Sequence, residues 1–308
     1  MRAVVIRTAG GPGVLGVADL PVPEPGPGEV RLAVWAAAVN PADLELRARA
    51  EPRPAPWVPG MDAAGTVDAV GEGVERLVPG EHVMAVVNPF GPHGGAQAER
   101  VVVPAASVVR APAGVGLAQA ATLPMNGLTA MTCLDLLGPA HGRTLLVTGG
   151  AGHLASFVVP LSKDAGWRVV ADARPQDEPA VRALGADEVV PRGDALGAAV
   201  RGVLPDGADA AVDTAALQRR VVPALRDGAV LVDVKGWEPG PLERDIRVER
   251  AFVYTAFGRT DWLEELARKV ASGRLRLPVP REVAPPDVGA VHERVGAGGQ
   301  RGRTVVVL

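Results

Sequence analysis

A glycine-rich turn between a predicted strand and a predicted helix constrains this chain more than any other stretch. Residues 145–147 are an apolar run, and apolar residues then recur at helical spacing after Leu154. Between them, Gly150-x-Gly152-x-x-Ala155 fits the strand–turn–helix pattern that binds dinucleotides. The first glycine permits the turn, the second lets the backbone approach a pyrophosphate, and the small third residue lets the helix pack on the strand. The stretch therefore predicts an anion site, formed around Gly150 and Gly152, at a helix N-terminus.

Two residues depart from the usual form of this pattern. His153 lies inside the turn, where small residues are common. Pro160 lies inside the following helix, where it would kink the helix or remove a hydrogen bond. An ordinary glycine-rich turn in an α/β domain therefore stays open as the alternative.

Length, charge and cysteine content exclude several classes of protein. The 308 residues are enough for one large or two ordinary domains, and a net charge of -3 gives no electrostatic case for nucleic acid or an anionic membrane. The single cysteine, Cys133, excludes a disulfide within the chain and a multi-cysteine zinc cluster. The apolar run at Ala3–Ile6 is too short for a signal peptide, and no run of ~18 apolar residues could span a membrane. We expect a cytoplasmic protein.

The first 110 residues have the pattern of an all-β domain. Short β-rich segments are separated by clusters of proline and glycine, which indicates a barrel or a sandwich. The predicted strands are Ala3–Arg7, Val30–Ala38, Gly65–Val70, His82–Val87 and Ala98–Val103. A short helix is expected at Pro41, and the proline-rich segment Ala50–Pro59 is expected to be a loop.

The middle of the chain alternates predicted strands and helices, which indicates a parallel sheet with right-handed crossovers. A helical region over Leu117–Leu137, broken at Pro124 and Gly127, precedes it. The predicted strands are Leu145–Thr148, Arg168–Ala171, Glu188–Val190, Ala208–Asp213 and Ala229–Val234, with a further one near Ala251–Thr255. The predicted helices are Leu154–Ala165, Glu178–Leu184, Ala195–Val203 and Gln218–Leu225. A helix over Asp261–Ser272 and a strand over Arg303–Leu308 end the chain.

Several motifs together resemble the medium-chain dehydrogenase/reductase superfamily, in its zinc-free quinone oxidoreductase (zeta-crystallin-like) branch. They lie in one order along the chain, at 38–43 (Ala-Val-Asn-Pro-Ala-Asp), 60–67 (Gly-Met-Asp-Ala-Ala-Gly-Thr-Val), 70–74, 79–83, 94–99, 123–130 and 184–189. The resemblance implies a fold of class α/β: a GroES-like β-barrel catalytic domain from residues 1–120 and 258–308, plus an inserted Rossmann doubly wound parallel sheet from residues 121–257. It further implies that nicotinamide and substrate bind in the cleft between them.

The resemblance also bears on zinc. The alcohol dehydrogenase branch has a cysteine in the place of Asn40 and a His-Glu pair in the place of Met61-Asp62. Zinc prefers thiolate and imidazole ligands, so that only Asp62 could coordinate it here. We expect no metal, and the five histidines show no ligand spacing.

The end of the second Rossmann strand bears on the choice of coenzyme. An acid there reads the ribose diol of NAD, whereas Arg or Lys nearby favours the 2′-phosphate of NADP. The alignment with the branch puts the diol-reading position at Ala173 rather than Asp172, with Arg174 in the following loop and Arg192 after the third strand. These arginines favour NADPH; the alternative for Arg174 is a solvated arginine paired with Asp177 or Asp172.

Further cofactor positions are implied by the resemblance alone. Gly152, His153 and Leu154 would line the pyrophosphate. Thr129 matches the residue that hydrogen-bonds the nicotinamide region, and Asn40 lies near the nicotinamide ribose. Val234 and Lys235 follow a Rossmann strand where the backbone meets nicotinamide, and Phe257 would wall the ring. Lys235 is read either as a surface lysine or as an electrostatic aid to an enolate.

The implied reaction is hydride transfer from NADPH to a small-molecule substrate, a quinone or an activated C=C bond. The tyrosine that many relatives carry two residues after the matched Asp43 is replaced by Glu45, which leaves Asn40 and Asp43 as polar catalytic candidates. Asp43 could instead serve only the first turn of its helix. Two alternatives stay open: a non-redox enzyme on this scaffold (a cyclase, lyase or dehydratase of specialised metabolism), and a binding protein without turnover. A homodimer is expected through a Rossmann edge strand at Val248–Thr255.

Overall fold

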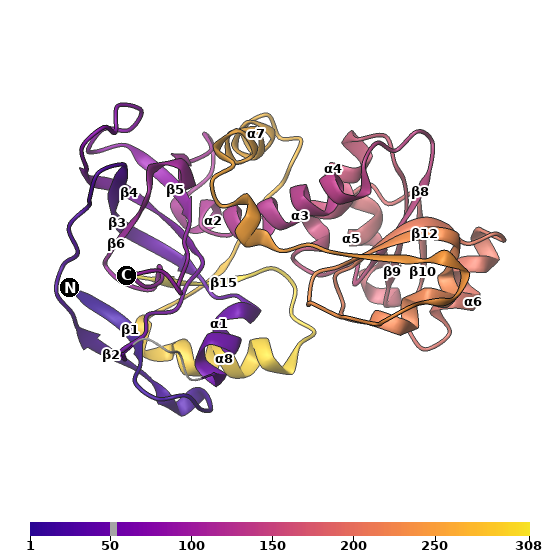
Figure 1. Ribbon diagram of the computed structural model, residues 1–308, viewed down its shortest axis with the longest axis horizontal. Coiled ribbons are helices and arrows are strands. Elements are labelled where there is room, and N and C mark those ends of the chain that lie inside the picture. Colours follow the sequence, from indigo (N-terminus) through magenta and orange to yellow (C-terminus); the bar gives the residue numbers. More distant parts are fainter. Residues whose placement is uncertain (50–53) are drawn as a thin grey trace. The chain divides into compact units, whose positions relative to one another are not determined.

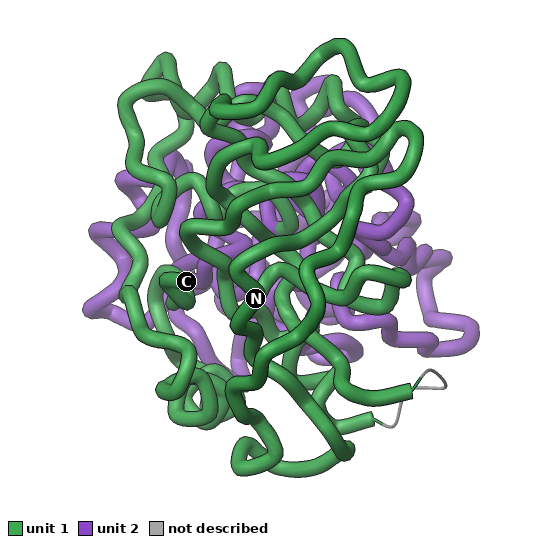
Figure 2. Tube along the Cα trace, turned by 90° about the vertical axis from the view of Figure 1, so that its left-hand side faces the viewer, with its two compact units in different colours: residues 1–125, 257–308 green, residues 126–256 purple. Residues whose placement is uncertain are grey.

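The chain divides into two compact units, which Figure 2 colours separately. The computed structural model describes residues 1–49 and 54–308. Unit 1 is residues 1–125 with 257–308, and unit 2 is residues 126–256. The junctions expected from sequence, 120/121 and 257/258, differ from these by five residues and one. The loop expected at Ala50–Pro59 starts within residues 50–53, which lie outside the described residues.

Unit 1 is built on a β-sheet of the GroES-like type (Figure 1). Its strand order is β14-β15-β3-β4-β5-β7, with β6 paired to β3 and a separate hairpin of β1 and β2. The strands are β1 (Arg2–Ile6), β2 (Leu15–Asp19), β3 (Glu29–Ala38), β4 (Asp62–Val70), β5 (His82–Val86), β6 (Arg100–Pro104), β7 (Val108–Arg110), β14 (Arg281–Val283) and β15 (Thr304–Val307). The helices are α1 (Pro41–Ala48), α2 (Leu117–Ala120), α7 (Thr260–Ala271) and α8 (Val288–Ala297).

Alternation along β3 explains the core of unit 1. Val30, Leu32 and Val34 point to one face and pack with valines from β4, β5 and β6. Gly65 of β4 makes the pairing possible, because a Cβ there would lie 2.0 Å from the carbonyl oxygen of Ala33. The close approach coincides with an irregularity in the β3–β4 register near Val34.

Unit 2 contains a six-stranded parallel sheet in the order β10-β9-β8-β11-β12-β13. This is the doubly wound Rossmann order, whose direction reverses beside β8. The strands are β8 (Thr144–Thr148), β9 (Arg168–Ala173), β10 (Glu188–Pro191), β11 (Ala208–Asp213), β12 (Leu225–Asp233) and β13 (Arg247–Arg250). The helices are α3 (Pro124–Leu137), whose first two residues belong to unit 1, α4 (Ala155–Asp164), α5 (Glu178–Ala183) and α6 (Leu196–Val203).

Three expectations about local structure are wrong. The segment expected as a strand at 251–255 contains instead a 3₁₀ helix, Val253–Ala256, and the edge strand is β13, which overlaps only the start of the expected Val248–Thr255. The expected helix Gln218–Leu225 is a 3₁₀ helix, Gln218–Ala224, that contains Pro223, which has no N–H to extend an α-helical ladder. Gly127 does not break α3, because a helical glycine costs only about 1 kcal/mol relative to alanine.

Candidate cofactor and active site

The glycine turn follows β8 and leads into α4 as the sequence predicts. Gly149 has a φ of +67°, a conformation that L side chains rarely adopt. A Cβ on Gly150 would lie 2.9 Å from the carbonyl oxygen of Asp172 and 3.0 Å from the Cβ of Ala171. A Cβ on Gly152 would lie 3.0 Å from the carbonyl oxygen of Gly149. The turn therefore needs small residues at positions 150 and 152, because a larger side chain would prevent its close packing against β9 and against its own backbone.

Asp172, near the end of β9, stabilises this turn through a hydrogen bond to its backbone. Its side chain is buried, and its carboxylate accepts a hydrogen bond from the backbone N–H of Gly149. Burial is the largest influence on Asp172 and raises the pKa of its carboxyl, which the Gly149 amide and the Arg192 guanidinium oppose. Its Oδ2 has no hydrogen-bond partner among the described residues and lies 3.8 Å from Nε of Arg192. One oxygen of this acid is thus committed to the turn.

The imidazole of His153 is packed into unit 2. It is 7% exposed and meets the ring of Phe157 edge-on, with ring centroids 5.0 Å apart. Ser156 Oγ donates to the His153 carbonyl oxygen at 2.6 Å, which holds the first turn of α4. The departure from small residues in the turn is therefore accommodated by burial of the ring against α4.

The backbone of the turn fits a diphosphate. The N–H groups of Leu154 and Ala155, at the start of α4, have no acceptor among the described residues. Amides at a helix N-terminus attract anions, both as donors and through the helix dipole. Pro160 lies within α4 without ending it, four residues before the last helical residue. The space that the glycines leave, together with these backbone N–H groups, fits the diphosphate of a dinucleotide.

Two arginines lie at the carboxyl ends of the neighbouring strands β9 and β10. Arg174 directly follows β9 and Arg192 directly follows β10, where the Arg192 N–H donates to the Ala173 carbonyl oxygen at 3.0 Å. Both side chains are about half exposed, at 48% and 42%. Arg174 lies 3.4 Å from the carboxylate of Asp177, the pairing expected if it were an ordinary loop arginine. These two arginine side chains therefore lie beside the end of β9, which is the position at which such folds distinguish NAD from NADP.

The other predicted contacts in unit 2 lie on α3 and after β12. Thr129 is on α3 and almost fully buried. The turn after β12 is fixed by Asp233, whose carboxylate accepts from the N–H groups of Lys235 at 3.0 Å and Trp237 at 2.7 Å. Val234 in this turn is partly buried and Lys235 is exposed.

In unit 1 a buried polar cluster contains both predicted catalytic residues. Asn40 caps α1, and its backbone N–H donates to Oδ2 of Asp43 at 2.7 Å. The other oxygen of Asp43 accepts from the N–H of Gly60 at 2.8 Å. The Asn40 side-chain nitrogen donates to Oδ2 of Asp62 at 2.7 Å, and Oδ1 of Asp62 accepts from the N–H of Met125 at 2.6 Å.

Burial dominates the electrostatics of this cluster. It raises the pKa of Asp43 to about 7 and that of Asp62 to about 6, against the lowering effect of the amides bonded to each. Burial also lowers the pKa of Arg303 to about 10, although both carboxylates oppose this. Arg303 thus favours the charged form of both carboxylates, whereas the nearby Asp62 disfavours the charged form of Asp43.

Comparisons with known proteins decide the family. Residues 26–113 match the alcohol dehydrogenase GroES-like domain, and residues 184–306 match the zinc-binding dehydrogenase family. The chain is 34% identical over 255 residues to the chloroplast envelope quinone oxidoreductase homolog of Arabidopsis thaliana, covering 78% of this chain and 76% of the relative. The NADPH-dependent alkenal/one oxidoreductase of the same plant is 32% identical over 286 residues, covering 90% and 71%.

The chain belongs to the medium-chain dehydrogenase/reductase superfamily, in its quinone oxidoreductase branch. Solved structures agree. An alcohol dehydrogenase superfamily protein from Novosphingobium aromaticivorans superposes with a TM-score of 0.90 at 26% identity, over 100% of this chain and 99% of the other. A mycobacterial protein solved in complex with NADPH gives 0.87 at 26% identity, over 100% of both chains. The protein is accordingly an oxidoreductase of a nicotinamide-dependent family.

The sequence patterns assign neither Asp62 nor Arg303 a role in catalysis or cofactor binding. They indicate Asp62 only as a possible zinc ligand, and Arg303 only as the start of a strand. A signal for Asp62 exists, because it is the single charged residue in the apolar run Met61–Val67. Phe257, predicted as a wall of the nicotinamide site, belongs to unit 1, where its carbonyl oxygen accepts from Ser107 Oγ at 2.9 Å.

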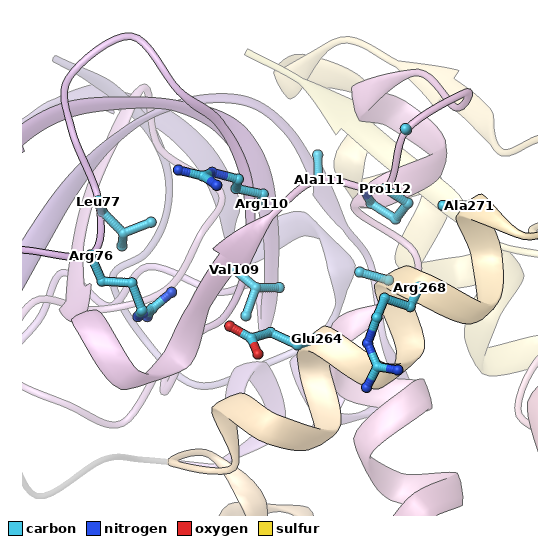
Figure 3. A pocket seen from close by; sticks show the side chains of 11 residues that line it. Arg76, Leu77, Val109, Arg110, Ala111, Pro112, Glu264, Arg268 and Ala271 are labelled. Atoms are coloured by element: carbon cyan, nitrogen blue, oxygen red, sulfur yellow. The ribbon is translucent and has the colours of Figure 1, made fainter.

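A separate groove of about 350 Å³ lies in unit 1 beside α7 (Figure 3). Arg76 and Arg110 line it from the barrel, and Glu264 and Arg268 line it from α7. None of the residues implicated in cofactor binding or catalysis lines it, and Arg110 is paired with Glu81 at 2.9 Å.

Over residues 1–49 and 54–308, no group of three or more His, Cys, Asp or Glu side chains is placed to hold a metal ion. In the same ranges no helix is long and apolar enough to cross a membrane.

Proposed function

We propose that this protein is an NADPH-dependent, zinc-independent reductase of quinones or of activated C=C bonds such as those of enones. The observation that carries the choice of coenzyme is the end of β9. There the acid of the strand, Asp172, is buried against the glycine turn, while Arg174, which lies 3.4 Å from Asp177, and Arg192 are half exposed beside it. A guanidinium pair suits a 2′-phosphate, which each arginine can bind through two donors. Relatives named for quinone and for NADPH-dependent alkenal/one reduction support the substrate class.

The chain's own residues would bind and orient, while bound NADPH supplies the hydride. The N–H groups at the start of α4 would hold the diphosphate, and the turn after β12 would present its backbone, with Val234 and Lys235, to the nicotinamide. Thr129 and Asn40 would fix the nicotinamide and its ribose, and Phe257 would wall the ring. Reduction of a quinone or enone takes one hydride and one proton, and the proton comes from water or a hydroxyl group at the substrate oxygen.

Asp43 has a different role in this proposal from a proton donor. Both of its oxygens accept backbone N–H groups, from Asn40 and Gly60. It therefore holds the start of α1 and the loop before β4 in place, and Asn40 is the residue of the pair that meets the cofactor.

Titration of the protein with NADPH and NADH, followed by fluorescence, tests the coenzyme. We expect NADPH to bind at micromolar concentration. Arg174→Ala and Arg192→Ala should each weaken NADPH by about tenfold, the value of one charge-assisted hydrogen bond, and leave NADH unchanged. Arg182→Ala, which removes an exposed arginine paired with Glu178 on α5, is the control. Equal affinity for both coenzymes, or tighter NADH binding through the second oxygen of Asp172, would reverse the assignment.

A measurement of turnover then distinguishes the reductase from the alternative functions. Oxidation of bound NADPH by simple quinones or enones supports the reductase. Binding without oxidation would favour the alternatives, a non-redox enzyme on the same scaffold or a binding protein. No binding at tens of micromolar would remove the proposal altogether. The cytoplasmic location and the homodimer through the sheet edge stay predictions, and a monomeric mass in light scattering would contradict the second.

A further inference from the structure

The groove beside α7 lies entirely within unit 1 (Figure 3). Its volume of about 350 Å³ falls within the range of small-molecule sites, which is about 300–1,000 Å³. One wall is formed by the end of β7 and the three residues after it, and the other by α7. Arg76 and Leu77, from the loop before β5, also line it. Every lining residue belongs to unit 1, so that the groove is complete without unit 2.

Apolar side chains make up most of the lining. Leu77, Val109 and Pro112 line the groove although each is largely buried in unit 1, and four alanines from α7 and from the segment after β7 add methyl groups. Small-molecule sites are usually lined in this way, by apolar side chains with a few polar groups that fix the orientation of the ligand. The groove therefore suits a ligand with an apolar body.

Two of the three arginines that line the groove are fixed by hydrogen bonds. Nη2 of Arg76 donates to the carbonyl oxygen of Val108 at 2.7 Å. Nε of Arg110 donates to Oε1 of Glu81 at 2.9 Å. Side chains that are already held in place lose less conformational freedom when a ligand binds, which favours affinity.

The third arginine, Arg268, lies on α7 together with the acid of the lining, Glu264. Both side chains are exposed and lie four residues apart, and over residues 1–49 and 54–308 neither has a side-chain hydrogen bond or an ion pair. Arg268 therefore keeps its donors for a ligand. With Glu81, which is paired with Arg110, two glutamates oppose the three arginines, so that the groove has an excess of one positive charge.

We propose that this groove binds a small monocarboxylate with an apolar body, such as a short-chain alkyl acid. The guanidinium groups would bind the carboxylate, for which the fork of arginine donors is well shaped, and the apolar lining would cover the chain. A single excess positive charge favours a monoanion, because Glu264 and Glu81 repel a second negative charge. The proposed coenzyme residues do not line the groove, and this inference does not rest on the proposed function.

Titration with hexanoate, followed by NMR of methyl-labelled protein without coenzyme, tests the proposal. We expect the methyl resonances of Leu77 and Val109 to shift, with a dissociation constant on the order of millimolar, as is ordinary for so small a ligand. 1-Hexanol, which has the same chain without the charge, should bind about tenfold more weakly because it lacks the charge-assisted hydrogen bonds. Hexyl phosphate at pH 8, a dianion, should bind no more tightly than hexanoate.

Two substitutions on α7 should change the affinity for hexanoate in opposite directions. Arg268→Gln should weaken binding about tenfold, the value of one charge-assisted hydrogen bond. Glu264→Gln should strengthen it about threefold, because it removes a negative charge near the carboxylate. Arg281→Gln, which removes an exposed arginine of β14 outside the groove, is the control and should leave the affinity unchanged. The methyl spectra of the free variants verify that each is folded.

Three results would overturn the inference. The first is that the Leu77 and Val109 methyl resonances do not shift at hexanoate concentrations far above the millimolar range. The second is an affinity that is the same in wild type, Arg268→Gln and Glu264→Gln. The third is binding of 1-hexanol or of hexyl phosphate more tightly than hexanoate. Because the titration contains no NADPH, these results are independent of whether the protein is a reductase.

Discussion

The buried imidazole of His292 should make this protein sensitive to acid, and replacing it by leucine should remove that sensitivity. His292 lies on α8, is 1% exposed, and neither of its ring nitrogens has a hydrogen-bond partner among the described residues. Burial, followed by the nearby Arg47 guanidinium, lowers its pKa from 6.5 to about 4. The folded protein therefore holds this ring neutral where the unfolded chain would protonate it.

The sign and size of the effect follow from the two pKa values. Because the folded-state pKa is depressed for a base, the unfolded state binds more protons between pH 6.5 and pH 4, and folding stability falls as the pH falls through that window. At pH 5 the unfolded ring is almost fully protonated and the folded ring is mostly neutral, which costs about 2 kcal/mol of stability relative to pH 8. Above pH 7 the contribution vanishes.

Urea denaturation at pH 8 and pH 5 measures this difference. In His292→Leu the change in the free energy of unfolding between the two pH values should be smaller than in wild type by about 2 kcal/mol. At pH 8 we expect the variant to stay within about 1 kcal/mol of wild type, because it replaces a buried ring without hydrogen bonds by an apolar side chain. Asp43 and Asp62 titrate in the opposite sense, but they do so equally in both proteins and cancel in the comparison. His82→Leu, which removes an exposed imidazole, is the matched control.

The result that refutes this reasoning is a variant whose stability falls between pH 8 and pH 5 as much as that of wild type. That outcome would mean that the folded protein protonates His292 as readily as the unfolded chain does.

Two further predictions concern stability and thiol reactivity. Gly65→Ala should lower the free energy of unfolding by more than about 3 kcal/mol in urea denaturation, because the added Cβ would lie 2.0 Å from the carbonyl oxygen of Ala33. The control is Gly16→Ala on β2, whose Cβ would meet nothing within 4 Å and which should change the free energy of unfolding by less than about 1 kcal/mol. Equal effects of the two substitutions would refute the packing argument. Burial raises the pKa of the Cys133 thiol to about 12, so a disulfide reagent at pH 8 should leave it unmodified in the folded protein and modify it at once in guanidinium; rapid reaction without denaturant would contradict its burial.

Much of this molecule is local enough to be predicted from its sequence. The glycine turn between β8 and α4 could be located because strand periodicity, glycines and helix periodicity follow one another within twenty residues. The parallel direction of the strands in unit 2 follows from the alternation of strands and helices. The family follows from motifs that are spaced along the whole chain. Local signals failed where tertiary pairing decides the outcome. Leu225 begins β12 because it lies beside Ala208 of β11, although its own neighbours in sequence have a helical pattern.

The predicted site residues could be named from sequence, but only the tertiary structure gave their partners. It buries the ring of His153 against Phe157 and turns Asp172 toward Gly149. Asp62, at the start of β4, bonds both Asn40 and Met125, which are distant from it in sequence. No local pattern in the sequence encodes that these three residues meet. Sequence thus determined which backbone turns and strands form, since these depend on near neighbours. Only the folded chain decided which buried polar groups meet, because desolvation favours partners for them that the sequence order does not specify.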